Sequence, residues 1–352
     1  MSELTAKISE LWTESPLNYL RVGALVTILS VVYLFSGLQA GYPGWVLLVF
    51  NVLIVNFVLY GILLLGLNLQ YGYAGIVNFG PVLFFALGAY TVALVSAEST
   101  FSDLGMGMPW YVGVAAALVV VLVVAFILSL STIQLRGDYL AVVTLAGAEI
   151  FHEMAAGLPA TLGGNQGIPG IPRIFHDIAP DAFTAGLAAF GALTGLLIIS
   201  YAVMQRLGES PFGRVLRGIR DDETAVEFLG KDIFSYKIKT FLIGSVPMGL
   251  AGAFLGLING GVAPGFITID VTVLVWVGML IGGAGSNRGA LVGLLIISSF
   301  QLFTRFANQS IPVGSNTFAS LRLMAVGLLM ILIIVYRPQG LFGDPDKLEV
   351  DA

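Results

Sequence analysis

The chain has 352 residues, of which 57% are hydrophobic and 11% are charged, and its mean hydropathy is +0.93. A soluble domain carries about a quarter charged residues, so this composition excludes an ordinary soluble protein and indicates one that uses lipid as its solvent. The net charge of −5 argues against nucleic-acid binding, and a sequence without cysteine excludes disulfides, thiolate catalysis and thiolate metal sites.

The first nineteen residues are polar and contain Glu3, Glu10 and Glu14, so they do not resemble a cleaved signal peptide. We expect residues 1–19 to form a cytosolic N-terminal segment with a short surface helix. Beyond it, apolar runs separated by polar breaks predict ten spanning helices, at residues 20–37, 45–67, 76–96, 110–131, 139–157, 184–205, 238–258, 272–284, 289–304 and 319–336.

The basic residues test this count, because cytosolic loops of membrane proteins are enriched in lysine and arginine. With the N-terminus in the cytosol, only Arg173, Arg305 and Arg322 of the sixteen basic residues fall outside or near the outer ends. Trp45 and Trp110 then lie at outer interfaces, which suits indole rings. We therefore predict an all-α integral membrane protein with both termini inside, a transmembrane domain over 20–336 and a cytosolic tail over 337–352.

Two connections are longer than turns. Residues 158–183 form an outer loop rich in glycine and proline, and residues 206–239 form an inner loop with seven basic and six acidic residues. The inner loop is predicted to contain two short helices. Ser210 and Pro211 can start the first, and Asp221 or Asp222 can cap the second, which Gly230 can end. A solvated loop that obeys the charge rule is the alternative, but it would not explain a capped acidic helix.

Arg214, Arg217 and Arg220 recur every third residue and are expected to share a broad helix face. The segment Ser210-Pro211-Phe212-Gly213-Arg214, together with Ile219 to Glu223, Ala225 and Leu229-Gly230, resembles the cytosolic coupling loop of branched-chain amino-acid ABC-transporter permeases, the LivM/LivH family. In ABC importers this loop carries a Glu-Ala-Ala motif and fits a cleft of the ATPase. Here Thr224 stands in place of the first alanine. The resemblance assigns ATPase coupling to Ser210, Pro211, Phe212, Gly213, Arg214, Arg217, Arg220, Asp221, Asp222, Glu223, Ala225 and Gly230.

Three further segments, 66–90, 135–150 and 337–343, resemble the same family in the same order, and the length and tail favour the LivM branch. The resemblance implies a non-enzymatic permease subunit in a prokaryotic cytoplasmic membrane. Its partners would be a LivH-like second permease, two ATPase subunits of the LivG/LivF kind that hold ATP and Mg²⁺, and an extracytoplasmic protein that binds leucine, isoleucine or valine. Related permeases carry urea, short amides or monosaccharides, so those substrates remain alternatives. No cofactor is expected on this chain.

Glycines and an asparagine interrupt the apolar pattern between Gly72 and Pro81. Unpaired backbone at membrane depth is tolerated only where protein or water satisfies it, often on a substrate path. A plain cytosolic turn is the equal alternative. The candidate path residues here are Gly75, Asn78, Phe79 and Gly80.

Glu149 lies near the middle of the fifth predicted span, with His152 and Glu153 one turn further on. Ionisable groups at that depth usually face a cavity or a partner. One helix supplies too few ligands for a metal, so a structural or path-gating carboxylate is favoured over a proton relay. A proton- or sodium-coupled secondary carrier built on Glu149 and Glu153 is the rival class, and it would not need the inner loop.

Gly282 to Gly289 could be mistaken for a phosphate loop, but no Gly-Lys-Ser/Thr ending occurs in the chain, so no Walker A site is predicted. In the outer loop, contact with the binding protein is predicted at Gly163, Gly164, Asn165 and Gly167.

Overall fold

The computed structural model describes residues 53–98, 104–132, 137–177, 179, 181–310, 320–321, 324–328, 331 and 340–341. The expected N-terminal segment and the first span lie outside these residues, as do most of the tenth span and the C-terminal tail apart from residues 340–341. Six helices in the described part are long and apolar enough to cross a membrane: 54–73, 110–130, 139–157, 182–209, 233–259 and 264–282. The count of ten and the orientation stay predictions.

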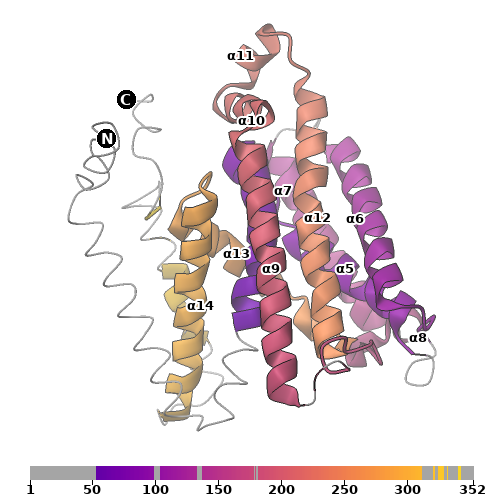
Figure 1. The fold of residues 1–352 in the computed structure, drawn as a ribbon. Helices are drawn as coiled ribbons and strands as arrows, with labels where there is room; N and C mark the ends of the chain where they lie inside the picture. Colours follow the sequence, from indigo (N-terminus) through magenta and orange to yellow (C-terminus); the bar gives the residue numbers. More distant parts are fainter. Residues whose placement is uncertain are drawn as a thin grey trace, which may run out of the picture.

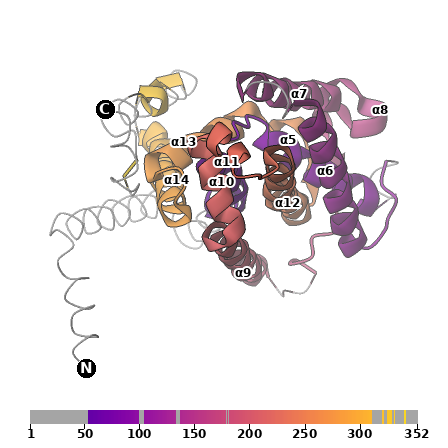
Figure 2. The same ribbon diagram turned by 90° about the horizontal axis from the view of Figure 1, so that it is seen from above.

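The helices form one bundle (Figures 1 and 2). A continuous helical stretch consists of η1 (Leu53–Leu59), α4 (Tyr60–Leu67) and η2 (Asn68–Tyr73), and it is followed by α5 (Pro81–Ser96), α6 (Trp110–Thr132) and α7 (Gly137–Gly157). After the outer loop come α9 (Ala182–Glu209), α12 (Ile233–Asn259), α13 (Ile269–Gly282) and α14 (Asn287–Ser310). The predicted eighth and ninth spans are therefore longer than the sequence suggested.

Helix α12 is the centre of the packing, and it contacts α4, α5 and α6. Glycine makes these contacts close. A Cβ added at Gly252 of α12 would overlap the backbone carbonyl of Phe85, and one added at Gly88 of α5 would overlap that of Gly249. Small residues that let helix backbones approach are the usual basis of helix association in membranes.

Two of the long helices extend beyond an apolar layer. Helix α9 has 28 residues and α12 has 27, or about 40 Å each at 1.5 Å per residue, against roughly 30 Å of hydrocarbon core. At the end where α9 finishes and α12 begins, they carry the helices α10 (Pro211–Asp221) and α11 (Glu223–Phe228). We call α10 and α11 the platform; it projects from one end of the bundle (Figure 1).

The opposite end is closed by the loop expected at 158–183. It contains α8 (Pro159–Leu162), the 3₁₀ turn η3 (Gly164–Gln166) and strand β1 (Ile168–Pro169). Strand β1 pairs antiparallel with β2 (Gly261–Val262), with Ile168 opposite Val262, and the 3₁₀ turn η4 (Pro264–Phe266) follows. This small sheet was not predicted, and it ties the outer loop to the turn between α12 and α13.

Candidate functional site

The local structure of the platform is as the sequence predicts. Ser210 is the N-cap of α10 and its side chain accepts from the Gly213 N–H at 3.4 Å, with Pro211 in the first turn. Asp222 caps α11 by accepting from the Ala225 N–H at 3.1 Å. Gly230 follows the end of α11 with φ of +74°, the left-handed conformation in which glycine commonly ends a helix.

The inner face of α10 is bonded to the bundle. Leu216 and Ile219 are buried, the Arg217 guanidinium donates to the Gly208 carbonyl and lies 5.5 Å above the ring of Tyr73, and the Arg220 Nη1 donates to the Gly72 carbonyl at 2.5 Å. Arg214 and Arg220 are exposed and Arg217 is half-buried, so the shared broad face stays a prediction. Because positions three residues apart turn progressively around a helix, Arg217 and Arg220 can also reach carbonyl groups of α9 and η2.

The outer face of the platform combines acids with two apolar side chains. Asp221, Asp222 and Glu223 are exposed, and beyond them Phe228 is 87% and Leu229 78% exposed at the far tip. Phe228 was not predicted to be a functional residue. An apolar pair between Glu227 and Gly230, in an otherwise charged segment, could have indicated a contact site there. Phe212, in contrast, stacks on Tyr236 of α12 with ring centroids 5.5 Å apart, so it packs between the platform and α12.

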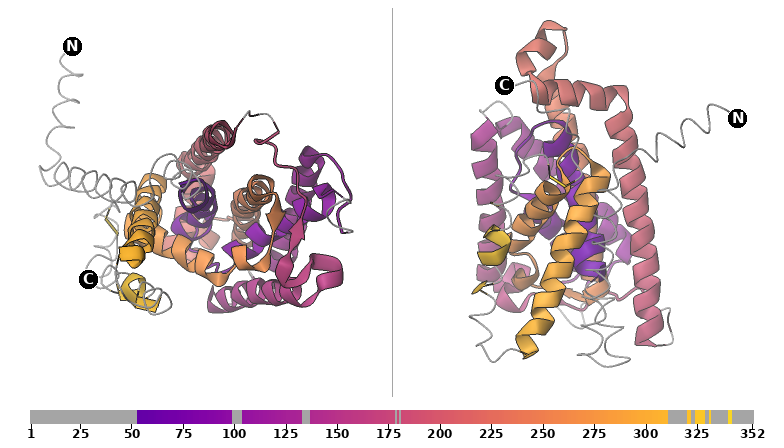
Figure 3. Two further views of the ribbon diagram at one scale, coloured as in Figure 1. Left: turned by 90° about the horizontal axis from the view of Figure 1, so that it is seen from below. Right: turned by 90° about the vertical axis from the view of Figure 1, so that its left-hand side faces the viewer.

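Figure 3 shows α10 lying across the end of the bundle, with α11 beyond it (right panel). One ion pair connects α11 to α12: the Lys237 Nζ lies 2.5 Å from the Glu223 Oε1. The Glu223 side chain is 54% exposed, so solvent screens the pair and its contribution to stability is at most about 1 kcal/mol. The position of α11 is therefore stabilised by packing and helix caps more than by this ion pair.

Between η2 and α5 the chain is not helical. We call residues 74–80 the break. Trp276, which hydrogen bonds to it, lies six residues before the platform end of α13, or about 9 Å inside the bundle. Asn78 has no exposed surface. The sequence left two alternatives for this segment, an interruption of the helix at membrane depth and a plain cytosolic turn. In the structure most residues of the break are packed inside protein, which favours the interruption.

Several polar backbone groups of the break are paired within the protein, as membrane depth requires. The Phe79 N–H donates to the Thr144 Oγ1 at 3.0 Å, the Gly80 N–H donates to the Asn78 Oδ1 at 2.7 Å, and the Trp276 Nε1–H donates to the Asn78 carbonyl at 2.9 Å. Phe79 is stacked on Trp276 at 4.8 Å between ring centroids. Asn78 and Gly80 thus hold the break together, and neither lines an open path in this structure.

Amide side chains on η2 extend this pairing to other helices. The Asn78 Nδ2 donates to the Gln70 Oε1 at 2.7 Å, and the Gln70 Nε2 donates to the Phe241 carbonyl of α12 at 2.9 Å. Nearer the platform, the Asn68 Nδ2 donates to the Asn287 Oδ1 of α14 at 2.7 Å. Asn68 and Gln70 lie in the segment 66–90 that resembles the family, but no role was predicted for them; polar residues in an apolar helix were the available signal.

The platform contacts the chain immediately before the break, because Arg220 donates a hydrogen bond to the Gly72 carbonyl. Gly75, the remaining path candidate, is exposed with φ of +70°, and an added Cβ would lie 3.4 Å from the Arg220 Cγ. Gly75 therefore lies beneath the platform and not on a central path.

Glu149 lies at mid-length of α7 but faces outward. It is exposed, as is Glu153 one turn further on, whereas His152 is half-buried with its Nδ1 unpaired. On insertion scales a charged side chain at the centre of a spanning helix costs roughly 2.5–3.5 kcal/mol. Within the described residues, no three His, Asp or Glu side chains are grouped closely enough to hold a metal ion.

The outer loop separates its four candidate contact residues. Gly164 and Gly167 are buried and Gly163 is half-buried, whereas Asn165 is exposed. A Cβ added at Gly167 would overlap the Val262 carbonyl, so this glycine permits the close approach that the small sheet needs. The expected contact role of Gly164 and Gly167 is corrected to a structural one, and Asn165 alone presents a side chain outward.

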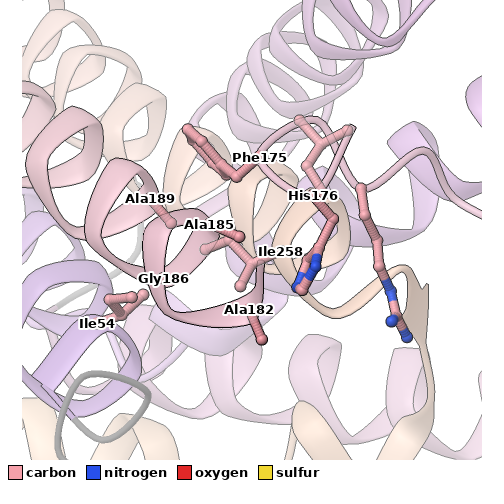
Figure 4. A pocket seen from close by; sticks show the side chains of 10 residues that line it. Ile54, Phe175, His176, Ala182, Ala185, Gly186, Ala189 and Ile258 are labelled. Atoms are coloured by element: carbon pink, nitrogen blue, oxygen red, sulfur yellow. The ribbon is translucent and has the colours of Figure 1, made fainter. Parts of the chain in front are cut away.

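A small cavity also lies at this end, between the start of α9 and the end of α12 (Figure 4). Phe175, His176, Ala185 and Ile258 are among its lining residues, and its volume is about 70 Å³. Ligand pockets measure roughly 300–1,000 Å³, so this cavity is too small to hold an amino acid.

Membrane-length apolar helices, a buried break in the backbone and a polar platform at one end define a helical membrane protein of the transporter class. A match to the family described as "Branched-chain amino acid transport system / permease component" covers residues 48–334. The chain belongs to this family.

Relatives support the LivM branch that the motifs indicated. The chain is 29% identical over 327 residues to the "Probable branched-chain amino acid transport permease protein LivM" of Methanocaldococcus jannaschii, covering 84% of this chain and 93% of the relative. It is 29% identical to the LivM permease protein of Escherichia coli, covering 80% and 67%, and 24% identical to the LivH permease protein of that organism, covering 82% and 92%. No solved structure matches the chain.

Proposed function

We propose that this chain is the LivM-type permease subunit of an ATP-driven importer for leucine, isoleucine and valine in a prokaryotic cytoplasmic membrane. Family membership and the names of the LivM relatives support the substrate class. An ABC permease for urea, short amides or monosaccharides is the alternative within the class. The platform faces the cytosol in this proposal, because the loop 206–239 that contains it carries seven of the ten basic residues of the described chain.

The observation that carries the proposal is the two-sided platform. Its outer side presents Phe228 and Leu229 almost fully to solvent, although burying such side chains is favourable by about 1.5–3 kcal/mol each. An exposed apolar pair rimmed by polar residues marks an interaction site. We assign this side to a partner ATPase, which would hold ATP and Mg²⁺, and the acids from Asp221 to Glu223 to the polar rim.

The inner side of the platform would carry motion into the membrane domain. Arg220 is bonded to the Gly72 carbonyl, where η2 ends and the break begins. A displacement of α10 would therefore act first on residues 74–80, which form no helix and are tied to η2 by the Gly75 N–H bond to the Tyr71 carbonyl. At the other end, the exposed Asn165 and the small sheet would meet an extracytoplasmic binding protein.

The rival class, a proton-coupled secondary carrier, relied on Glu149 as an interior coupling group. Its side chain faces outward, and such a carrier gives no reason for Phe228 and Leu229 to be exposed. A second, LivH-like permease and two ATPases complete the importer in this proposal.

The test uses the full complex in proteoliposomes and the double variant Phe228→Ser/Leu229→Ser. Truncating one interface anchor costs about 2 kcal/mol or more, or about 30-fold in affinity, so we expect the ATPase to be lost on purification together with ATP-dependent leucine uptake. Phe266→Ser is the matched control, since Phe266 is 48% exposed at the opposite end. Full ATPase retention by the double variant would contradict the docking role, and uptake driven by a proton gradient without ATP would contradict the importer class.

A further inference from the structure

The outward face of α7 differs from those of the other spanning helices that the structure describes. On α6 the exposed side chains at mid-length are apolar, among them Val119, Val123 and Phe126. On α7 the exposed stripe contains Glu149 and Glu153 beside Ile150 and Met154. Figure 2 shows α7 along the edge of the bundle, so nothing in the described chain covers this stripe.

Depth makes Glu149 incompatible with a lipid environment, and Glu153 lies on the same side nearer the end of α7. Glu149 lies twelve residues from the start of α7 and eight from its end, or about 18 Å and 12 Å along the helix. Glu153 lies about 6 Å further along the same side. Ionisable side chains at this depth almost always face a partner, the bundle interior or water and not acyl chains. The α6 face carries no such group and suits lipid.

We infer that the exposed stripe of α7 is covered by a second permease chain of different sequence, which presents cationic or hydrogen-bond-donating side chains to Glu149 and Glu153. The inference rests on the proposed function, in which the importer contains two permeases. It adds which surface of this chain meets the second permease, and that this second chain is not another copy.

Charge decides between a copy and a different chain. A two-fold symmetric pair of copies would use the same patch on both subunits, which brings four carboxylates of the same sign together at low dielectric, where repulsion between them is strong. A different chain can place a lysine, arginine, glutamine or serine there instead. Electrostatic complementarity of this kind selects the partner and disfavours self-pairing.

The shape of the stripe leaves room for such a side chain. Glu149, Ile150, Glu153, Met154, Gly157 and Leu158 line an open hollow of about 530 Å³. Gly157 contributes no side chain, and a Cβ there would meet nothing within 4 Å. The hollow thus offers two acceptors above an apolar floor, which fits a long donor side chain on a neighbouring spanning helix.

The experiment places a photoreactive phenylalanine analogue at Ile150 in the full complex, with the two permeases tagged differently. Val119 is the matched control, because both side chains are 60% exposed at mid-length of their helices. We expect the Ile150 site to cross-link to the second permease and the Val119 site to give lipid adducts only. Cross-linking of the Ile150 site to another copy of this chain, or to lipid alone, would overturn the inference, as would an equal yield of permease adduct from both sites.

A second measurement uses the double variant Glu149→Gln/Glu153→Gln. Glutamine is less costly in a membrane than a carboxylate, so the variant does not hinder insertion of α7. Removing charges that pair with a partner should reduce recovery of the second permease by roughly tenfold or more. Unchanged recovery would overturn the inference. The ATPase that we propose to bind Phe228 and Leu229 is measured in the same samples. Loss of the ATPase would count against the proposed function. Retention of the ATPase without a cross-link from the Ile150 site would count against the α7 surface alone.

Discussion

Replacing Asn78 with alanine tests whether the amide network holds the break. The Asn78 side chain is fully buried; it accepts from the Gly80 N–H and donates to the Gln70 Oε1, each at 2.7 Å. Truncation leaves these two buried groups without partners. Each unpaired group costs about 1–3 kcal/mol, so we expect a loss of about 2–6 kcal/mol, a large part of the roughly 5–15 kcal/mol that stabilises a folded protein.

The assay is thermal unfolding of the detergent-solubilised permease, followed by the fraction that remains monodisperse on size exclusion. Asn165→Ala is the control, because Asn165 is an exposed asparagine of the outer loop and surface changes usually stay within about 0.5 kcal/mol. Gln70→Ala should also destabilise, and the double variant should lose less than the sum, because the two side chains share one hydrogen bond. An unfolding temperature of Asn78→Ala equal to that of Asn165→Ala would refute the structural role of the network.

Two further outcomes are expected. Gly252→Ala should destabilise the bundle by about 1–3 kcal/mol, because its Cβ would overlap the Phe85 carbonyl, whereas Gly191→Ala meets nothing within 4 Å and should be neutral or slightly stabilising in the same unfolding assay. A cysteine introduced at Asn165 should react with an impermeant maleimide added outside, and one at Glu227 should react only after permeabilisation; labelling of both from one side would contradict the proposed orientation.

Local features of the platform could be predicted from the sequence because they depend on neighbours in the chain. Ser210 and Asp222 cap their helices through groups three residues away, and Gly230 adopts a conformation that glycine favours. The directions of Arg217 and Arg220 could not be predicted. Their partners, Gly208 and Gly72, belong to α9 and η2, and only the packing of α10 across the bundle brings them within reach.

The membrane helices show a second limit. The depth of Glu149 followed from its position in an apolar run, but its direction did not, because apolar residues such as Val142, Leu145 and Ile150 are also exposed on α7 and periodicity cannot mark the inner face. The burial of the glycines in the outer loop could not be predicted from the sequence either. Gly167 is buried against Val262 of β2 and Ala263, which lie almost a hundred residues away in the chain, whereas Gly164 is buried near Pro159 and Ala156.

The break is the place where the two proposed contacts of this chain converge. On one side Arg220 of the platform bonds Gly72; on the other, the Phe79 N–H bonds Thr144 of α7, five residues before Glu149 on the same helix. In the proposed importer, a displacement of the platform would reach α7 through one short non-helical segment and two hydrogen bonds. Coupling between sites requires an element that has two arrangements, and residues 75–80 lie outside any helix, held at their start by the Gly75 N–H bond to the Tyr71 carbonyl. In this proposal the amides of Gln70 and Asn78 would have two roles. They provide hydrogen-bond partners for buried polar groups, and they would contribute to the free energy needed to rearrange the break.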